Sequence, residues 1–222
     1  LNLNENDTIF TFYTSVDWDA ALHFPTSLYK NQFDFIKDLI NTFKDFNNLN
    51  LVIRIHPAEI TGSNPAYVSS EEYIKSLNPS KNIKIIPAKS KISSYDLAKI
   101  SKAVIVYNTK LGIELPPFGI PVIVGGDCWI KHKGFSFDLS SETPILYYLE
   151  NVDKLKLNPT QIELAQKFAF YFYFIRCIDC PELVSDGNKF QIKLKKNFND
   201  FPKMGFDLIT EKIINKLEVV SY

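Results

Sequence analysis

A histidine and a proline follow directly on a strongly apolar stretch of the chain. Residues 51–55 read LVIRI, and His56 and Pro57 come next. A histidine at a strand end can donate a hydrogen bond to a phosphate oxygen and help a phosphate-bearing group to leave. The proline would fix the turn that directs the ring. The alternative is a half-buried histidine bonded to a backbone carbonyl, but the position at a strand end favours the ligand role.

Small and polar residues end the other segments that have strand-like composition. They are Thr14, Ser15 and Asp17 after the first segment, Lys89 after the third, Asn108, Thr109 and Lys110 after the fourth, and Gly125 and Gly126 after the fifth. Hydroxyls, exposed N–H groups at a helix start and one or two cations bind phosphate well. The pattern therefore predicts a phosphate-bearing ligand.

Strands alternate with helices along the first two-thirds of the chain. The predicted strands are residues 8–15, 49–57, 82–87, 102–108 and 120–126, and the predicted helices between them are 26–46, 69–77, 93–101 and 109–115. The first of these helices opens at Pro25 and Thr26, and Ser69 or Ser70 and then Ser93 are the expected caps of the next two. Such alternation predicts an α/β fold, a Rossmann-like parallel sheet with helices on both faces. Ligands bind at the carboxyl ends of the strands in such sheets, where the polar residues lie.

The rest of the chain is predicted to be helical. Residues 158–176, with Asn158 as the expected cap, and residues 205–220 have helical patterns. We expect a Rossmann-like domain over residues 1–145 and a helical extension over 146–222 packed on the same domain. Cys177 and Cys180 have the spacing of half a zinc site, but no second pair is present, so we interpret them as packing residues. Because the chain begins at Leu1, we expect it to be a piece of a longer protein.

Composition narrows the functional classes. Lysine plus arginine and aspartate plus glutamate both number 25, so the formal net charge is zero and gives no electrostatic signal for nucleic acid or an anionic membrane. No apolar run approaches the roughly twenty residues of a membrane span. Three cysteines do not make a disulfide scaffold. We expect a cytoplasmic location, with peripheral attachment at the inner membrane through partners as an alternative.

Several of these stretches resemble one known family. YTSVD, IRIHP, SSYDLAKISKAVIVYNTKLGIELPPFGIPVIVGG and KGFSFD occur in this order within residues 8–145. In order and spacing they are similar to bacterial capsule and surface polysaccharide glycosyltransferases, a group that includes Kdo transferases. The resemblance implies the C-terminal, donor-binding half of a GT-B fold, which pairs two Rossmann-like domains across a cleft.

The resemblance also implies roles for single residues. His56 of the His-Pro pair would hold the nucleotide phosphate, Thr109 would open an anion-binding helix start, and Glu114 would accept hydrogen bonds from the ribose hydroxyls.

Lys110 departs from the family, which usually has a hydroxyl there; it adds a cation or points to solvent. The loop with Thr14, Ser15 and Asp17 would approach the donor phosphates, or cap the next helix. Gly125 and Gly126 would let the backbone approach the sugar, or turn the chain. Lys131, His132 and Lys133 are interpreted as a solvated loop.

The predicted function is a glycosyltransferase domain that binds a nucleotide-activated sugar for surface or capsular polysaccharide synthesis. Its partners would be the sugar donor, with a CMP-sugar favoured, a saccharide acceptor and an N-terminal GT-B domain. No cofactor and no metal are expected. Two alternatives stay open: a CDP-glycerol-type transferase of polyol phosphate, and a non-catalytic nucleotide-sugar-binding module.

Overall fold

The computed structural model of the chain describes residues 7–16, 28–61, 68–176, 183–185 and 190–192. The chain forms two compact units, residues 1–166 and 167–222. The first unit holds the main sheet. In the second, β7 (Leu183–Ser185) pairs antiparallel with β8 (Phe190–Ile192).

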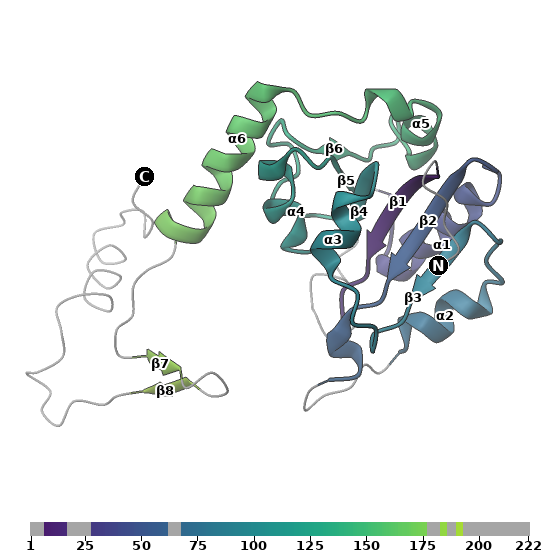
Figure 1. Cartoon of the computed structure of the whole chain (residues 1–222), viewed down its shortest axis with the longest axis horizontal. Coiled ribbons are helices and arrows are strands. Elements are labelled where there is room, and N and C mark those ends of the chain that lie inside the picture. Colours follow the sequence, from purple (N-terminus) through teal and green to yellow (C-terminus); the bar gives the residue numbers. More distant parts are fainter. Residues whose placement is uncertain (1–6, 17–27, 62–67, 177–182, 186–189, 193–222) are drawn as a thin grey trace, which may run out of the picture. The chain divides into compact units, whose positions relative to one another are not determined.

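The main sheet has six parallel strands in the order β3-β2-β1-β4-β5-β6 (Figure 1). They are β1 (Thr8–Tyr13), β2 (Leu49–Arg54), β3 (Ile83–Ile86), β4 (Ala103–Val106), β5 (Val122–Val124) and β6 (Phe137–Asp138). This order is that of doubly wound dinucleotide-binding domains. Strands β2 and β3 are added on one side of β1, and β4, β5 and β6 on the other, so the strand order reverses between β1 and β4. The predicted Rossmann-like sheet and its five strands are confirmed. The strand β6 was not predicted, because a strand of two residues has no periodicity in the sequence.

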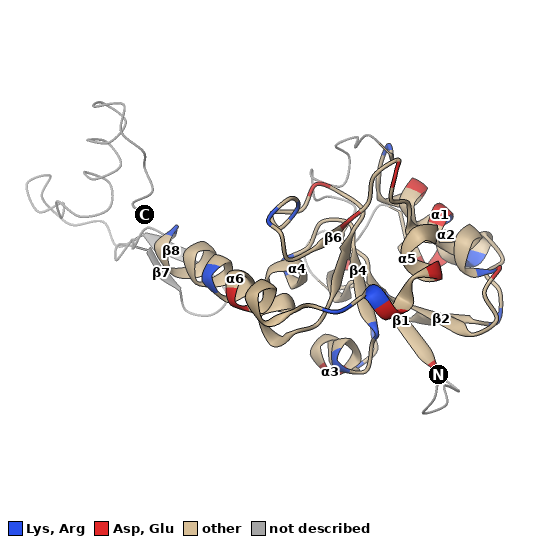
Figure 2. Cartoon of the chain, turned by 90° about the horizontal axis from the view of Figure 1, so that it is seen from above, with Lys and Arg blue, Asp and Glu red and all other residues tan. Residues whose placement is uncertain are grey.

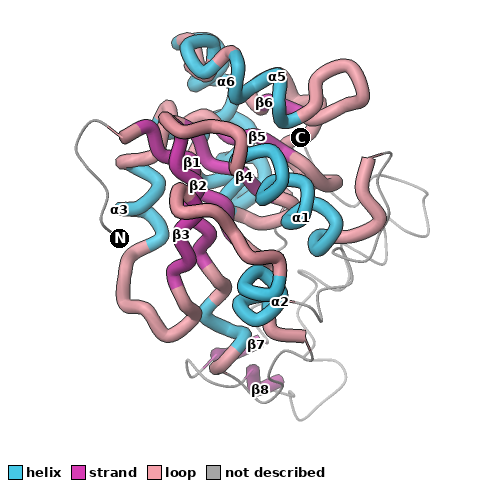
Figure 3. Tube along the Cα trace, turned by 90° about the vertical axis from the view of Figure 1, so that its right-hand side faces the viewer, coloured by secondary structure: helices cyan, strands magenta, loops and turns pink. Residues whose placement is uncertain are grey.

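Helices cover both faces of this sheet. Figure 3 shows α1 (Gln32–Phe43) and α2 (Ser70–Ser76) on one side of the strands and α3 (Ser94–Lys99) on the other. The remaining helices are α4 (Leu111–Glu114), α5 (Ile145–Glu150), α6 (Pro159–Phe170), the 3₁₀ turns η2 (Pro57–Glu59), η3 (Pro116–Phe118) and η4 (Val152–Lys154), and the π-helical turn η5 (Tyr171–Ile175). The predicted helices over residues 69–77, 93–101 and 158–176 are confirmed within a few residues at each end.

Side-chain caps decide where most of these helices begin. Ser69, Ser93 and Asn158 accept backbone N–H bonds as predicted. The predicted start of the first helix at Pro25 and Thr26 was wrong, because α1 begins only at Gln32. Asn31, in an extended conformation, accepts from the backbone N–H of Asp34 at 3.0 Å and thereby satisfies one of the free donors of the first turn.

Aromatic rings fill the space between α1 and the sheet. Phe10 and Phe12 of β1 are fully buried and meet Phe43 and Phe35 of α1 edge to face, with ring centroids 5.5 Å apart in both pairs. This geometry is favourable beyond the burial of area. The packing holds α1 against the strands and leaves the carboxyl ends of β1 and β2 free to carry polar residues.

Charged residues of both signs are interspersed over the helices and loops (Figure 2), which agrees with the balanced composition. No helix in the described part of the chain has the length and apolar character to cross a membrane. The predicted helix over residues 205–220, and Cys177 and Cys180, lie outside the described residues. The packing of residues 146–222 on the sheet domain as one extension stays a prediction.

Candidate functional site

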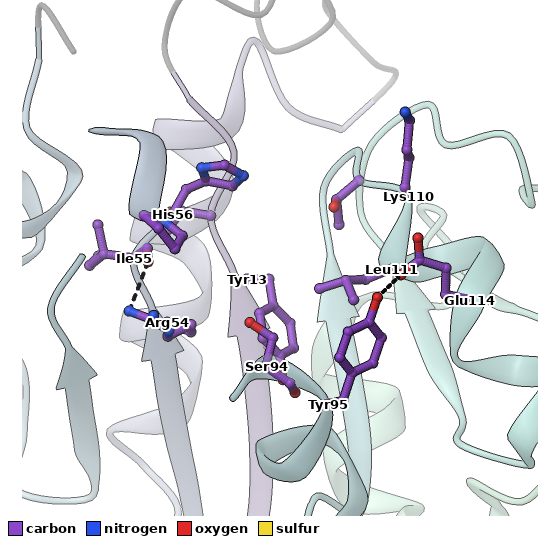
Figure 4. A pocket seen from close by; sticks show the side chains of 12 residues that line it. Tyr13, Arg54, Ile55, His56, Ser94, Tyr95, Lys110, Leu111 and Glu114 are labelled. Carbon is purple, nitrogen blue, oxygen red and sulfur yellow. Dashed lines mark hydrogen bonds between the residues drawn. The ribbon is translucent and has the colours of Figure 1, made fainter. Parts of the chain in front are cut away.

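A pocket of about 250 Å³ opens at the carboxyl ends of β1 and β2 (Figure 4). Its walls come from these strand ends and from the beginnings of α3 and α4. It therefore lies next to the ends of the neighbouring strands β1 and β4, where the direction of the sheet connections changes and where ligands of doubly wound sheets bind. The predicted site residues that line it are Thr14, His56, Pro57, Thr109, Lys110 and Glu114.

His56 lines this pocket, and the backbone holds one of its two ring nitrogens. Its Nδ1 accepts from the backbone N–H of Ala58 at 3.1 Å, in the first turn of the 3₁₀ helix that Pro57 opens. The neutral ring must then carry its proton on Nε2. Burial, and after it the charge of Arg54, lower the pKa of His56 below the ordinary value. The free protein thus offers a neutral Nε2–H donor at this position.

Thr14 and Ser15 join the strand ends to one another. Thr14 Oγ1 accepts from the backbone N–H of His56 at 2.9 Å and ties β1 to β2. Ser15 Oγ donates to the carbonyl of Asn108 at 2.9 Å and ties β1 to the end of β4. Ser15 also exchanges two hydrogen bonds with the buried Gln32 side chain of α1. Both hydroxyls therefore fix the strand ends around the pocket.

The start of α4 forms the opposite wall. Lys110 is exposed, and in Figure 4 it lies across the pocket from His56. Glu114 accepts a hydrogen bond from the Tyr95 hydroxyl at 2.7 Å, and this bond raises the pKa of Tyr95. The Tyr95 ring is half exposed. One side of the pocket therefore has a cation and a hydroxyl at the helix start, and a carboxylate held by a phenol one turn further on.

Other predicted site residues lie outside the lining of the pocket. They are Ser15, Lys89, Asn108, Gly125 and Gly126. A Cβ at Gly125 would stand 2.5 Å from the buried Phe35 ring, and a Cβ at Gly126 would meet the carbonyl oxygen of Tyr107. Close packing of the chain directly after β5 therefore leaves no space for a side chain at these two positions. Asp17 lies outside the described residues.

Six pocket residues were not predicted from the sequence, and Tyr13, Tyr95 and Arg54 are three of them. Tyr13 donates from its hydroxyl to the carbonyl of Ser94 at 2.6 Å and Tyr95 binds Glu114. Arg54 is only 3% exposed, although it lines the pocket. The available signal for Arg54 was a charged residue inside the apolar stretch 51–55. Within the described residues, no group of three or more His, Cys, Asp or Glu side chains is placed to hold a metal ion.

Comparison with known proteins bears on the family and the fold. The sequence profile of a family described as capsule polysaccharide biosynthesis protein matches residues 1–156. No curated protein matches the chain significantly.

Solved structures with a similar fold include two transferases and one synthase. The beta Kdo 2,4 transferase KpsC of Thermosulfurimonas dismutans has 14% identity and a TM-score of 0.50, over 74% of this chain and 44% of that chain. The sucrose-phosphate synthase of Thermosynechococcus elongatus has 14% identity and a TM-score of 0.50, over 77% of this chain and 43% of that one. The beta Kdo 2,7 transferase KpsC of Thermosulfurimonas dismutans has 19% identity and a TM-score of 0.45, over 72% and 44%.

These likenesses establish the fold. They confirm the predicted Rossmann-like half of a GT-B architecture. The chain spans less than half the length of the solved chains it matches.

Proposed function

The chain belongs to the capsule polysaccharide biosynthesis protein family, and from this premise we propose that it binds the nucleotide-activated sugar of a glycosyltransferase in the pocket at the ends of β1 and β2. One observation carries the proposal. A histidine with a free Nε2–H, the Thr109 hydroxyl at the start of α4 and a buried arginine line one pocket at the switch point of the sheet. Each of these groups suits a phosphate.

The chemistry of sugar transfer needs such a site. An acceptor hydroxyl attacks the anomeric carbon, the bond from that carbon to the phosphate oxygen breaks, and the nucleotide leaves with additional negative charge on its phosphate. His56 would donate its Nε2–H to this phosphate, and the Thr109 hydroxyl at the start of α4 would donate a second hydrogen bond to it. Glu114 would accept hydrogen bonds from the ribose. The general base and the acceptor site would belong to a second, N-terminal GT-B domain.

The proposal includes a preferred donor and a location. A CMP-activated sugar is preferred because the His-Pro strand end resembles that of transferases which use CMP-sugars. The chain would act in the cytoplasm, where nucleotide-activated sugars serve as donors for surface polysaccharides, and would reach the inner membrane through partners.

Calorimetric titration of the protein with CMP, CDP, UDP and GDP tests the proposal. We expect one of these nucleotides to bind selectively, and His56→Ala to lose at least about tenfold in affinity because a hydrogen bond to a charged phosphate is removed. His132→Ala is the matched control, since His132 is exposed and lies outside the pocket. Absence of binding by all four nucleotides, or equal binding by His56→Ala, would contradict the proposal.

Turnover separates the transferase from a binding module. A transferase consumes the donor when the donor-binding chain is tested within its full-length protein with a saccharide acceptor. A non-catalytic module binds the nucleotide without consuming the sugar donor under the same conditions.

A further inference from the structure

Arg54 is a buried cation at the floor of the pocket. It ends β2, and its guanidinium donates to three backbone carbonyls: Ile55 at 3.2 Å, Pro87 at 2.6 Å and Ser90 at 2.9 Å. Its Nε–H is buried without a hydrogen-bond partner. The side chain is thus fixed in place by dipoles, and one donor is left unused.

No carboxylate of the described residues forms an ion pair with Arg54. The ionisable neighbour that acts on it is Tyr13, opposite Arg54 in the register of β1 and β2. Burial raises the pKa of Tyr13, so the phenol is neutral near pH 7. Burying a cation without a counter-charge costs free energy, and an anion bound next to it would offset that cost.

We propose that Arg54 supplies the fixed positive charge that holds the phosphate group of the ligand in this pocket, and that the exposed Lys110 contributes little. The inference rests on the proposed function and specifies which residue attracts the anion. Because the Arg54 side chain is almost fully covered, the anion would experience its charge through the pocket floor rather than displace its carbonyl bonds. Interactions of a buried charge are screened much less than those of an exposed lysine.

Arg54 has a second, structural effect that the test must separate. Its bonds to Pro87 and Ser90 hold the loop that leads to α3, and Ser94 and Tyr95 at the start of α3 form part of the pocket wall. Arg54→Met removes both the charge and the loop contacts. Arg54→Lys keeps the charge but lacks the forked donors that reach both carbonyls.

Titration with inorganic pyrophosphate near neutral pH measures the anion site directly. We expect Arg54→Met to bind pyrophosphate at least about tenfold more weakly than the wild type, because the buried positive charge in the pocket lining is lost. Arg54→Lys should stay within about threefold of the wild type, and Lys110→Met, which removes an exposed charge at the same pocket, should do the same. Both Arg54 variants should melt at lower temperature than the wild type.

Three results would overturn the inference. The first is no binding of pyrophosphate by the wild type, and the second is binding by Arg54→Met as tight as that of the wild type. The third is equal loss of pyrophosphate affinity in Arg54→Lys and Arg54→Met, which would show that Arg54 acts only through its loop contacts. If neither Arg54 variant folds, Lys110→Met decides. A loss of tenfold or more in that variant would assign the charge to Lys110, while near-wild-type binding supports Arg54.

The four nucleotides, titrated in parallel, distinguish this inference from the proposed function. Pyrophosphate binding that depends on Arg54, without binding of any nucleotide, would support the anion site and contradict the nucleotide-sugar site. Selective nucleotide binding that is unchanged in Arg54→Met would do the reverse.

Discussion

His56 and Arg54 are two residues apart in an extended segment, and each shapes what the other can do. The backbone at His56 is extended, so the two side chains leave the strand on the same side. The positive charge of Arg54 helps to keep the imidazole neutral. A neutral ring with its proton on Nε2 already has a donor for a phosphate oxygen and does not need to gain a proton first. An arriving phosphate would in turn favour the charged ring.

The neutral state of His56 predicts how stability depends on pH. Its pKa in the folded protein lies below the unfolded value of about 6.5. The unfolded state therefore binds more protons than the folded state once the pH falls below about 6.5. The free energy of unfolding decreases as the pH falls further, until the pH passes below the folded pKa. Wild type should lose more free energy of unfolding than His56→Gln between about pH 7.5 and pH 5. Urea unfolding at both pH values measures this.

The comparison with His56→Gln cancels the contribution of the carboxyl groups, which titrate in both proteins. Equal losses in the two proteins would show that the ring is not held neutral in the folded state. A smaller loss in the wild type would show that its pKa is raised instead.

At the scale of elements, Gly125 and Gly126, which follow β5, let the backbone pass close to α1 and to the end of β4. The Gly125 backbone N–H donates to the carbonyl of Val106 at 2.9 Å and continues the ladder between β4 and β5. The Phe35 ring of α1 fills the position where a side chain at Gly125 would stand. The absence of a Cβ lets the far end of the ring reach the backbone at the end of β5.

Gly125→Ala should therefore destabilise the protein by overpacking, by about 1–3 kcal/mol. Phe35→Leu would open space at this position, so the double variant should be less destabilised than the sum of the two single changes. Urea unfolding of the four proteins measures the cycle. If Gly125→Ala instead weakens nucleotide binding with unchanged stability, the glycine faces the sugar, as in the other interpretation of its sequence position.

Elements with a strong local signal could be predicted from the sequence. The apolar runs over residues 49–57 and 102–108 indicated strands, and serine caps marked the starts of α2 and α3. The start of α1 was misplaced because Leu28 continues the apolar pattern upstream of Asn31. The cap, and not the hydrophobic pattern, decides where the backbone becomes helical.

At the scale of the whole molecule, the pocket assembles four segments that are far apart in the sequence. Strand ends meet at one edge of a parallel sheet, so the convergence of Thr14, His56 and Thr109 could be predicted from topology alone. Tyr95 and Arg54 could not. Tyr95 reaches Glu114 across nineteen positions of sequence, and the burial of Arg54 depends on the carbonyls of a loop that follows another strand. Such contacts depend on tertiary packing, which has no local sequence pattern.

The first unit should fold without the chain that follows α6. All buried hydrophobic residues of the described chain precede Gln166, and hydrophobic burial is the main favourable term in folding. Two glutamines attach α6 to this unit: Gln161 Nε2 donates to the carbonyl of Gly134 and Gln166 Nε2 to that of Pro117, both at 3.1 Å. A protein that ends at Phe170 keeps both contacts and one further helical turn, whose N–H groups satisfy the carbonyls around Gln166.

We expect this shortened protein to melt in one cooperative transition within a few degrees of the parent and to bind nucleotide with unchanged affinity. Circular dichroism at increasing temperature and calorimetric titration measure the two properties. Loss of the cooperative transition would show that residues 171–222 complete the hydrophobic core. Unchanged binding is expected because the pocket walls lie entirely within residues 13–114. A stable fold with lost nucleotide binding would instead show that residues 171–222 contribute to the site.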